Sequence, residues 1–161
     1  MSRRTSISAA ARPGVETVME QIRQSGSTTP VTFLQCDLAD LSSVQRAAEA
    51  FLAQDSCLDV LMCNAGIMAH PAGLTADGYE IQFGTNHLGH ALLIHKLLPR
   101  LEATAAKGRD VRVITLTSFG LRGHPPGGIP FSNLRTTQEY PVLAGWICYG
   151  QSKLANLLYA R

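Results

Sequence analysis

Residues 57–66 have the sequence CLDVLMCNAG, an apolar run of strand length that ends in a glycine. Similar runs lie on either side of it, VTFLQCDL at residues 31–38 and DVRVITLTS at residues 110–118. The segments between these runs carry apolar side chains at helical spacing, for example at Val44 and Ala47. Strands that alternate with helices in this way are typical of a parallel sheet covered by helices.

The same periodicity predicts four helices along the chain. They are expected at residues 15–22, 42–51 and 78–101, with a last one that begins near Trp146. Asp77 is the expected cap of the third helix. Residues 6–11 (SISAAA) are a weaker strand candidate, and residues 119–145, rich in Gly and Pro, form a loop long enough to be functional.

The order of these elements predicts a doubly wound sheet with right-handed crossovers. In such a sheet, ligands bind at the carboxyl ends of the strands. Asn64, Ala65 and Gly66 follow one strand, and Ser118 ends another. We therefore expect these four residues to lie beside a ligand.

Length and composition indicate one folded domain over residues 1–161. With 45% hydrophobic and 16% charged residues the chain is too apolar for disorder, yet no uncharged apolar run approaches membrane-spanning length. The basic N-terminus lacks the apolar core of a secretory signal, so a cytoplasmic location is predicted. The net charge of +2 comes from scattered basic residues, so nucleic acid is not an expected partner.

Neither the cysteines nor the histidines indicate a metal site. The four cysteines lack the close paired spacing of a zinc site and are predicted to be buried thiols. His87 and His90 lie three residues apart on one helix, but no third ligand stands at a suitable spacing. A packing role for both histidines is therefore expected.

Tyr149 and Lys153 are four residues apart, so their side chains share one face of the last helix. An ammonium group close to a phenol lowers the pKa of the phenol, which favours general acid or base catalysis. The pair alone is a weak signal, because the same spacing is common on solvated helices. The alternative interpretation is ordinary helix surface.

The wider context strengthens the catalytic interpretation. NAG at residues 64–66 follows a strand, Asn86 lies within a helix in GTNHLGH, and Ser118 ends a strand in TLTS. Together with YGQSKLANLLYAR from Tyr149 onward, these motifs resemble the short-chain dehydrogenase/reductase family. The segments LDVLMCNAGIM and DGYEIQFGTNHLGHALLIHKLLP are most similar to its retinol dehydrogenase and WW-domain oxidoreductase branch.

The resemblance implies a catalytic tetrad of Asn86, Ser118, Tyr149 and Lys153. In this family Tyr149 would protonate a carbonyl oxygen or deprotonate an alcohol, while Ser118 would hold the same oxygen by a hydrogen bond. Lys153 would assist the tyrosine and hold the nicotinamide ribose. Asn86 would position a water in a proton relay to Lys153, although a polar cap at a helix irregularity is the alternative.

The resemblance also implies cofactor contacts. Asp37 and Leu38 match the motif that contacts adenine, although an ordinary helix-initiating acid is the alternative for Asp37. Asn64, Ala65 and Gly66 match the motif that lines the cofactor. Arg12 stands where a basic residue meets the 2′-phosphate of NADP, so NADP (as NADPH) is preferred over NAD; a solvated arginine is the alternative.

The implied fold is α/β, a partial Rossmann-like doubly wound parallel sheet with flanking helices. The chain is expected to lack the family's first strand, its TGxxxGxG turn and the part after the active-site helix, which should weaken cofactor binding and leave sheet edges unpaired. The predicted function is an NADP-dependent oxidoreductase that interconverts a small-molecule alcohol and a ketone or aldehyde. The alternative is a non-catalytic remnant that associates through its strands, and a homo-oligomer stays open.

Overall fold

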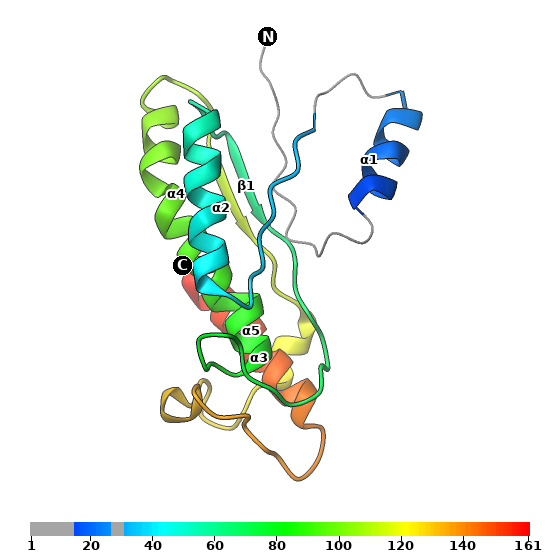
Figure 1. Ribbon diagram of the computed structural model, residues 1–161. Helices are drawn as coiled ribbons and strands as arrows, with labels where there is room; N and C mark the ends of the chain where they lie inside the picture. Colours follow the sequence, from blue (N-terminus) through cyan, green and yellow to red (C-terminus); the bar gives the residue numbers. More distant parts are fainter. Residues whose placement is uncertain (1–14, 27–30) are drawn as a thin grey trace.

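A computed structural model describes residues 15–26 and 31–161 (Figure 1). The predicted strand at residues 6–11 and the predicted NADP contact Arg12 lie outside the described residues. The elements are α1 (Val15–Gln24), α2 (Leu41–Gln54), β1 (Val60–Cys63), α3 (Ile81–Phe83), the π-helix η1 (Gly84–Leu88), α4 (Gly89–Ala105), β2 (Arg112–Thr115), the 3₁₀-helices η2 (Phe119–Gly123) and η3 (Phe131–Asn133), and α5 (Ala144–Tyr159).

Within the described residues the sheet consists of β1 and β2, which run parallel in the register Val60 to Arg112 through Cys63 to Thr115. Figure 1 shows α2 and α4 side by side along one side of these strands. A parallel sheet with flanking helices is the predicted fold class, and it is confirmed. No helix in the described part of the chain has both the length and the apolar character needed to cross a membrane.

The hydrophobic core lies between the two strands and the helices α2 and α4. The predicted apolar face of α2 is buried, including Val44 and Phe51, which are 0% and 1% exposed. It packs against Leu61 and Cys63 of β1 and against a row of α4 side chains, namely Leu93, Ile94, Leu97 and Leu101. Burial of this kind contributes about 1.5–3 kcal/mol for each large apolar side chain and makes this layer the main support of the fold.

Three of the four cysteines are buried free thiols, as predicted, and Cys57 is half-buried. Burial raises the pKa of Cys36 and of Cys63 to about 11. It raises the pKa of Cys148 to about 12. These thiols therefore stay protonated at neutral pH and behave as small apolar core groups.

The prediction of a strand at residues 31–38 is wrong. Leu34, Cys36 and Leu38 are buried and the residues between them are exposed or half-buried, so the side chains alternate as in a strand. The described residues nevertheless offer this segment no ladder of backbone hydrogen bonds. The alternation identified which side chains face the core, but a strand also requires a neighbouring strand to pair with.

The predicted helix at residues 78–101 is also corrected in two respects. Its cap is Glu80, whose carboxylate accepts hydrogen bonds from the backbone amides of Gln82 and Phe83, at 3.0 and 2.6 Å. Asp77 instead accepts a hydrogen bond from the amide of Leu41 at the start of α2, at 2.9 Å. In addition, the helical path widens into the π-helix η1 before it continues as α4.

Candidate active site

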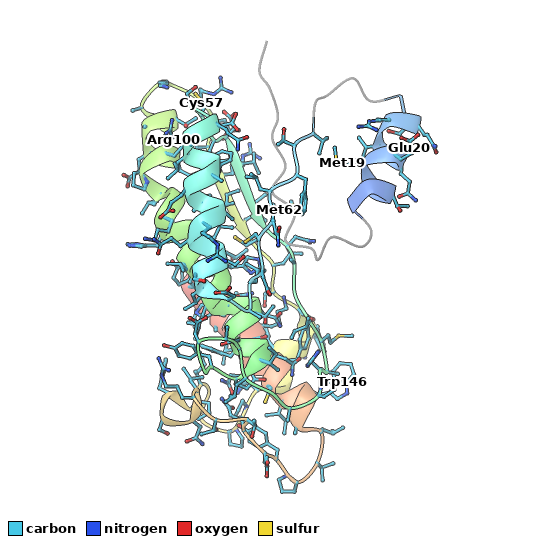
Figure 2. All side chains as sticks on the ribbon, viewed as in Figure 1. Met19, Glu20, Cys57, Met62, Arg100 and Trp146 are labelled. Atoms are coloured by element: carbon cyan, nitrogen blue, oxygen red, sulfur yellow. The ribbon has the colours of Figure 1, made fainter. Side chains whose placement is uncertain are left out.

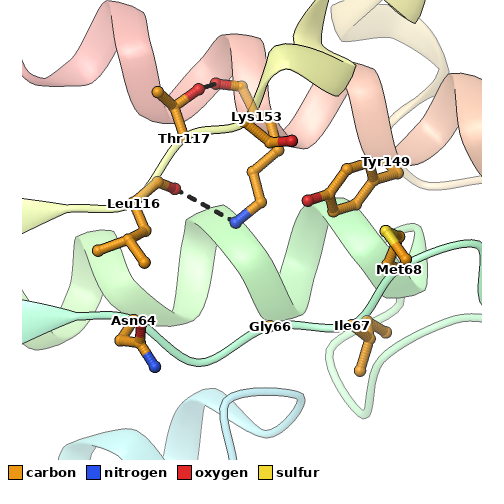
Figure 3. Close-up of a pocket in the computed structure, with 9 residues that line it drawn as sticks. Asn64, Gly66, Ile67, Met68, Leu116, Thr117, Tyr149 and Lys153 are labelled. Carbon is orange, nitrogen blue, oxygen red and sulfur yellow. Dashed lines mark hydrogen bonds between the residues drawn. The ribbon is translucent and has the colours of Figure 1, made fainter.

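A cavity of about 290 Å³ lies just beyond the carboxyl ends of β1 and β2 (Figure 3). Figure 2 shows Trp146, in the first turn of α5, at the opposite end of the molecule from Cys57 and Arg100. The helix thus begins at the same end as the cavity. The residues that line it are Asn64, Gly66, Ile67, Met68, Leu116, Thr117, Ser118, Tyr149 and Lys153.

A close approach of two backbones brings Tyr149 and Ser118 together. The Cα of Gly150, in α5, lies so close to η2 that an added Cβ would come within 2.7 Å of the Gly120 carbonyl oxygen. A Cβ on Gly120 itself would lie 2.9 Å from the Tyr149 ring and 3.4 Å from Ser118 Oγ. The phenol and the hydroxyl therefore border the same glycine.

Lys153 is hydrogen-bonded to the residues that follow β2, next to the cavity. Its side chain is 6% exposed, and its Nζ donates a hydrogen bond to the Leu116 carbonyl at 3.2 Å. Thr117 Oγ1 donates to the Lys153 carbonyl at 2.8 Å, which ties the same turn of α5 to the strand end. Burial lowers the pKa of Lys153 below its ordinary value of 10.5.

The ammonium and the phenol face each other across the cavity. Lys153 Nζ lies 5.7 Å from the centroid of the Tyr149 ring. Figure 3 shows the Tyr149 hydroxyl directed toward the part of the cavity where this ammonium lies. The ammonium thus places positive charge beside the phenol ring.

Asn86 lies behind the cavity wall rather than in it. The residue is fully buried in η1, and its side chain bonds both backbone groups of Ile67: Oδ1 accepts from the amide at 2.8 Å and Nδ2 donates to the carbonyl at 2.9 Å. Nδ2 also donates to Ser152 Oγ at 3.0 Å. Asn86 thus fixes the chain that follows β1 against α5.

Gly66 separates Asn86 from the cavity. A Cβ at this position would lie 2.7 Å from Asn86 Oδ1 and 3.7 Å from Lys153 Nζ. The space beside residue 66 is consequently available only while the residue is a glycine. Of the two neighbours predicted with it, Asn64 lines the cavity, and Ala65 is half-buried and packs against the hydrophobic core.

Asp37 and Leu38 do not line this cavity. The carboxylate of Asp37 accepts a hydrogen bond from the Ala39 amide at 2.9 Å, and the Asp37 amide donates to Ser43 Oγ at 3.0 Å. Leu38 is 4% exposed, and its carbonyl lies where a Cβ on Gly89 would reach within 2.6 Å. Asp37 thus contacts the start of α2, and Leu38 contacts the start of α4.

His90 is buried and His87 is half-buried, and both pack within the structure as predicted. His90 Nδ1 bonds the Asn86 carbonyl at 3.0 Å, and His87 Nδ1 bonds Asn156 Oδ1 at 3.0 Å. Burial lowers the pKa of both imidazoles, against smaller opposing effects of these hydrogen bonds. Across residues 15–26 and 31–161, no group of three or more His, Cys, Asp or Glu side chains is placed to hold a metal ion.

Sequence reasoning missed four residues of the cavity wall, namely Ile67, Met68, Leu116 and Thr117. All four are neighbours of predicted residues at the ends of the two strands. Their positions just past each strand were therefore the available signal. Sequence reasoning also missed Asn156, which shares the face of α5 that carries Lys153.

The arrangement suits chemistry at a single oxygen atom. The hydroxyl of Tyr149 and that of Ser118 can both reach a small group in the cavity, and the Lys153 ammonium provides positive charge nearby. Preorganised donors of this kind stabilise charge that develops on an oxygen during reaction. A phenol supported by an ammonium also serves as a general acid or base.

Comparisons with known proteins point the same way. A family model described as short chain dehydrogenase matches residues 4–132. The chain is 42% identical to an uncharacterized oxidoreductase of Schizosaccharomyces pombe, over 89% of this chain and 42% of that protein. It is 40% identical to retinol dehydrogenase 12 of Mus musculus, over 91% of this chain and 43% of that protein. The chain thus spans less than half the length of these two relatives.

A solved structure shows the same arrangement of elements. The crystal structure of an uncharacterized protein from Mycobacterium paratuberculosis superposes with a TM-score of 0.71 at 37% identity. The match covers 96% of this chain and 49% of that one. The parallel strands and flanking helices described above are therefore those of a known fold.

Proposed function

The chain belongs to the short-chain dehydrogenase family, in its retinol dehydrogenase-like branch, and on that premise we propose that it carries the catalytic part of an NADP-dependent oxidoreductase. The reaction is the interconversion of an alcohol and a ketone or aldehyde. The observation that supports it is the convergence of Tyr149, Ser118 and Lys153 on one cavity at the carboxyl ends of the strands. Similarity to a retinol dehydrogenase agrees with alcohol and aldehyde chemistry.

In the direction of reduction, the Tyr149 hydroxyl donates a proton to the carbonyl oxygen of the substrate. Ser118 Oγ accepts a hydrogen bond from the Gly120 amide at 3.1 Å, so the serine keeps its own proton to donate to the same oxygen. The Lys153 ammonium stabilises the negative charge that Tyr149 acquires. In the direction of oxidation, Tyr149 takes the proton of the alcohol.

The residues of the cavity fit a nicotinamide cofactor. Such a cofactor supplies or accepts a hydride when it is bound. Because Gly66 has no side chain, the space next to it in the cavity stays open. Lys153 offers a cationic donor for a ribose hydroxyl. Asn64 and Ile67 also line the cavity on this side, Asn64 with a polar side chain and Ile67 with an apolar one. The preference for NADP over NAD rests on the basic side chain of Arg12 in the sequence.

Asn86 serves this site through the backbone of Ile67. Its two hydrogen bonds to that residue hold one wall of the cavity at a fixed distance from α5. In the relay that the family resemblance implies, Asn86 would also position a water toward Lys153. The Asn86 backbone carbonyl is bonded to His90 and to Asn156.

A second candidate function is supported by the outer face of the sheet. Val60 and Met62 are 50% and 57% exposed, although they alternate with buried residues in β1. Exposed apolar side chains that gather on one face favour association with another chain. On this candidate, the chain associates through its strands and has no turnover.

Titration of the purified chain with NADPH separates the two candidates. The oxidoreductase predicts saturable binding, followed as a change in NADPH fluorescence, together with turnover of a generic aldehyde. The associating chain predicts no binding and a mass in solution above 17.3 kDa. NADH in place of NADPH, at the same concentrations, measures the cofactor preference.

A further inference from the structure

The side chain of Asn156 lies at the junction of three elements next to the cavity. It is 4% exposed and stands three residues after Lys153 on α5. Its Nδ2 donates to the Asn86 carbonyl of η1 at 3.1 Å and to the Leu116 carbonyl, one residue past β2, at 3.0 Å. One buried amide thus connects the π-helix, the strand end and the active-site helix.

The orientation of this amide is fixed by His87. Because Nδ2 donates to two carbonyl oxygens, the other end of the amide is the acceptor, and His87 Nδ1 donates to Oδ1 across 3.0 Å. The imidazole is itself held between two rings, Phe83 at 5.1 Å and Tyr159 at 5.5 Å between centroids. Both ends of the Asn156 amide therefore have hydrogen-bond partners, and the amide has a single orientation.

The Leu116 carbonyl is the feature that links Asn156 to Lys153. This oxygen accepts from Asn156 Nδ2 at 3.0 Å and from Lys153 Nζ at 3.2 Å. A carbonyl held by a rigid buried amide keeps its direction, and the ammonium that shares it keeps its place in the cavity wall. The lysine side chain has four rotatable carbon bonds, so without a fixed acceptor its ammonium has many other positions.

We propose that Asn156 is a positioning residue for the reaction, which holds the Leu116 carbonyl and thereby the Lys153 ammonium beside Tyr149. The inference rests on the proposed function, since Lys153 and Tyr149 are the groups that it serves. Asn156 itself is not among the residues that line the cavity.

The test is the titration of Lys153, followed by NMR on a protein labelled with ¹³C-lysine. The chain contains three lysines, Lys96, Lys107 and Lys153, so the signal is assigned with one Lys153→Arg spectrum. The titratable groups that face Lys153 from the described elements are Tyr149 of α5 and His90 of α4, and His87 of η1 in turn acts on His90.

In Asn156→Leu, which keeps the shape but loses the amide, the Leu116 carbonyl is no longer held in place, so the Lys153 ammonium can move toward water. Hydration favours the charged form, so the titration midpoint of Lys153 should rise by about 0.5–1 pH unit. If Asn156→Leu does not fold, Asn156→Ser, which can donate to only one carbonyl, gives the same comparison. Circular dichroism establishes that each variant is folded.

The matched control is Gln151→Met. Gln151 lies on the same helix, is 0% exposed, and its side-chain amide makes no hydrogen bond with the described residues. The midpoint of Lys153 should not move in this variant. An unchanged midpoint in a folded Asn156 variant, or an equal rise in Gln151→Met, would overturn the inference.

This test does not depend on turnover, so the two proposals fail separately. Absence of NADPH binding and turnover in the wild type counts against the proposed function, whatever the lysine titration shows. In an active protein, Asn156→Leu should lower kcat by about tenfold with little change in KM, because the positioned group acts in the chemical step.

Discussion

Gly150 and Gly120 meet backbone to backbone, so that one added carbon on Gly150 would lie 2.7 Å from the Gly120 carbonyl oxygen. The same carbon would lie 2.8 Å from backbone atoms of Gly123 and His124. Backbone atoms cannot turn aside as a side chain can. This contact sets the distance between α5 and η2, and therefore the distance between Tyr149 and Ser118.

Gly150→Ala should consequently destabilise the fold and separate the hydroxyls of Tyr149 and Ser118. Overpacking of this kind costs about 1–3 kcal/mol of the free energy of unfolding, measured by urea denaturation. The control is Gly123→Ala, on the facing segment, where the nearest atom to an added Cβ is the Trp146 carbonyl oxygen at 3.9 Å. Equal stability of the two variants would contradict the importance of the contact.

Gly66→Ala should weaken cofactor binding through Asn86. The new methyl group would lie 2.7 Å from Asn86 Oδ1, so the asparagine must release at least one of its bonds to Ile67. We expect NADPH to bind at least about tenfold more weakly, which corresponds to about 1.4 kcal/mol. Gly73→Ala, whose added Cβ would meet its nearest atoms at 3.9 Å, should bind NADPH as the wild type does.

Arg135 connects the loop before α5 to the segment before α3. Its guanidinium donates to the Tyr79 hydroxyl at 2.7 Å and to the Asp77 carbonyl at 3.1 Å, and it lies 4.2 Å from the centroid of the Tyr79 ring. In Arg135→Ala the loop should be cleaved several times faster in limited proteolysis. The expected effect is of this size because an exposed cation–π contact is worth only about 0.5–1 kcal/mol.

The control for this variant is Arg122→Ala. Arg122 lies 4.3 Å from the centroid of the Phe119 ring, so it makes a similar contact within a single short helix. Its removal should leave cleavage of residues 131–140 unchanged. Similar cleavage rates for Arg135→Ala and the wild type would show that the loop is held by other contacts.

His90 should make stability fall in mild acid. Burial lowers its pKa in the folded state below the ordinary value of 6.5, with smaller effects of the Asn86 hydrogen bond and of the charges of Lys153 and His87. Below pH 6.5 the unfolded chain therefore binds more protons than the folded one, and the stability present above 6.5 is lost as the pH falls through the folded pKa.

His90→Asn keeps an N–H donor near the position of Nδ1 but does not titrate. In urea denaturation series below pH 6.5, this variant should show a shallower loss of stability with falling pH than the wild type. His95 is exposed on the same helix, so His95→Asn is the matched control for the substitution. If the stability of His90→Asn falls with pH as steeply as that of the wild type, His90 is not the cause of the loss of stability in acid.

Several features could be predicted because they depend on local spacing. A spacing of four positions places the side chains of Tyr149 and Lys153 on one helix face, and in the structure both side chains line one cavity. The apolar face of α2 was equally visible in the periodicity, and so was the strand predicted within residues 57–66, although that strand ends at Cys63 rather than at Gly66. Each of these features is decided within about one turn of helix or one strand.

The features that the sequence did not reveal depend on contacts between distant segments. Residues 31–38 have the alternation of a strand, but the described residues provide no partner for its backbone. Glu80 rather than Asp77 caps α3, because Asp77 is engaged with the start of α2. The role of Asn156 requires three segments to meet, and no local pattern encodes such a meeting.

The most direct test of the account is Tyr149→Phe, which removes one oxygen atom and leaves the ring in place. Turnover with NADPH and an aldehyde should fall by at least about 10²-fold, because the proton donor is lost. The dissociation constant of NADPH should stay within about threefold of that of the wild type. Turnover near the wild-type rate in Tyr149→Phe would contradict the assignment of this phenol as the acid and base of the reaction.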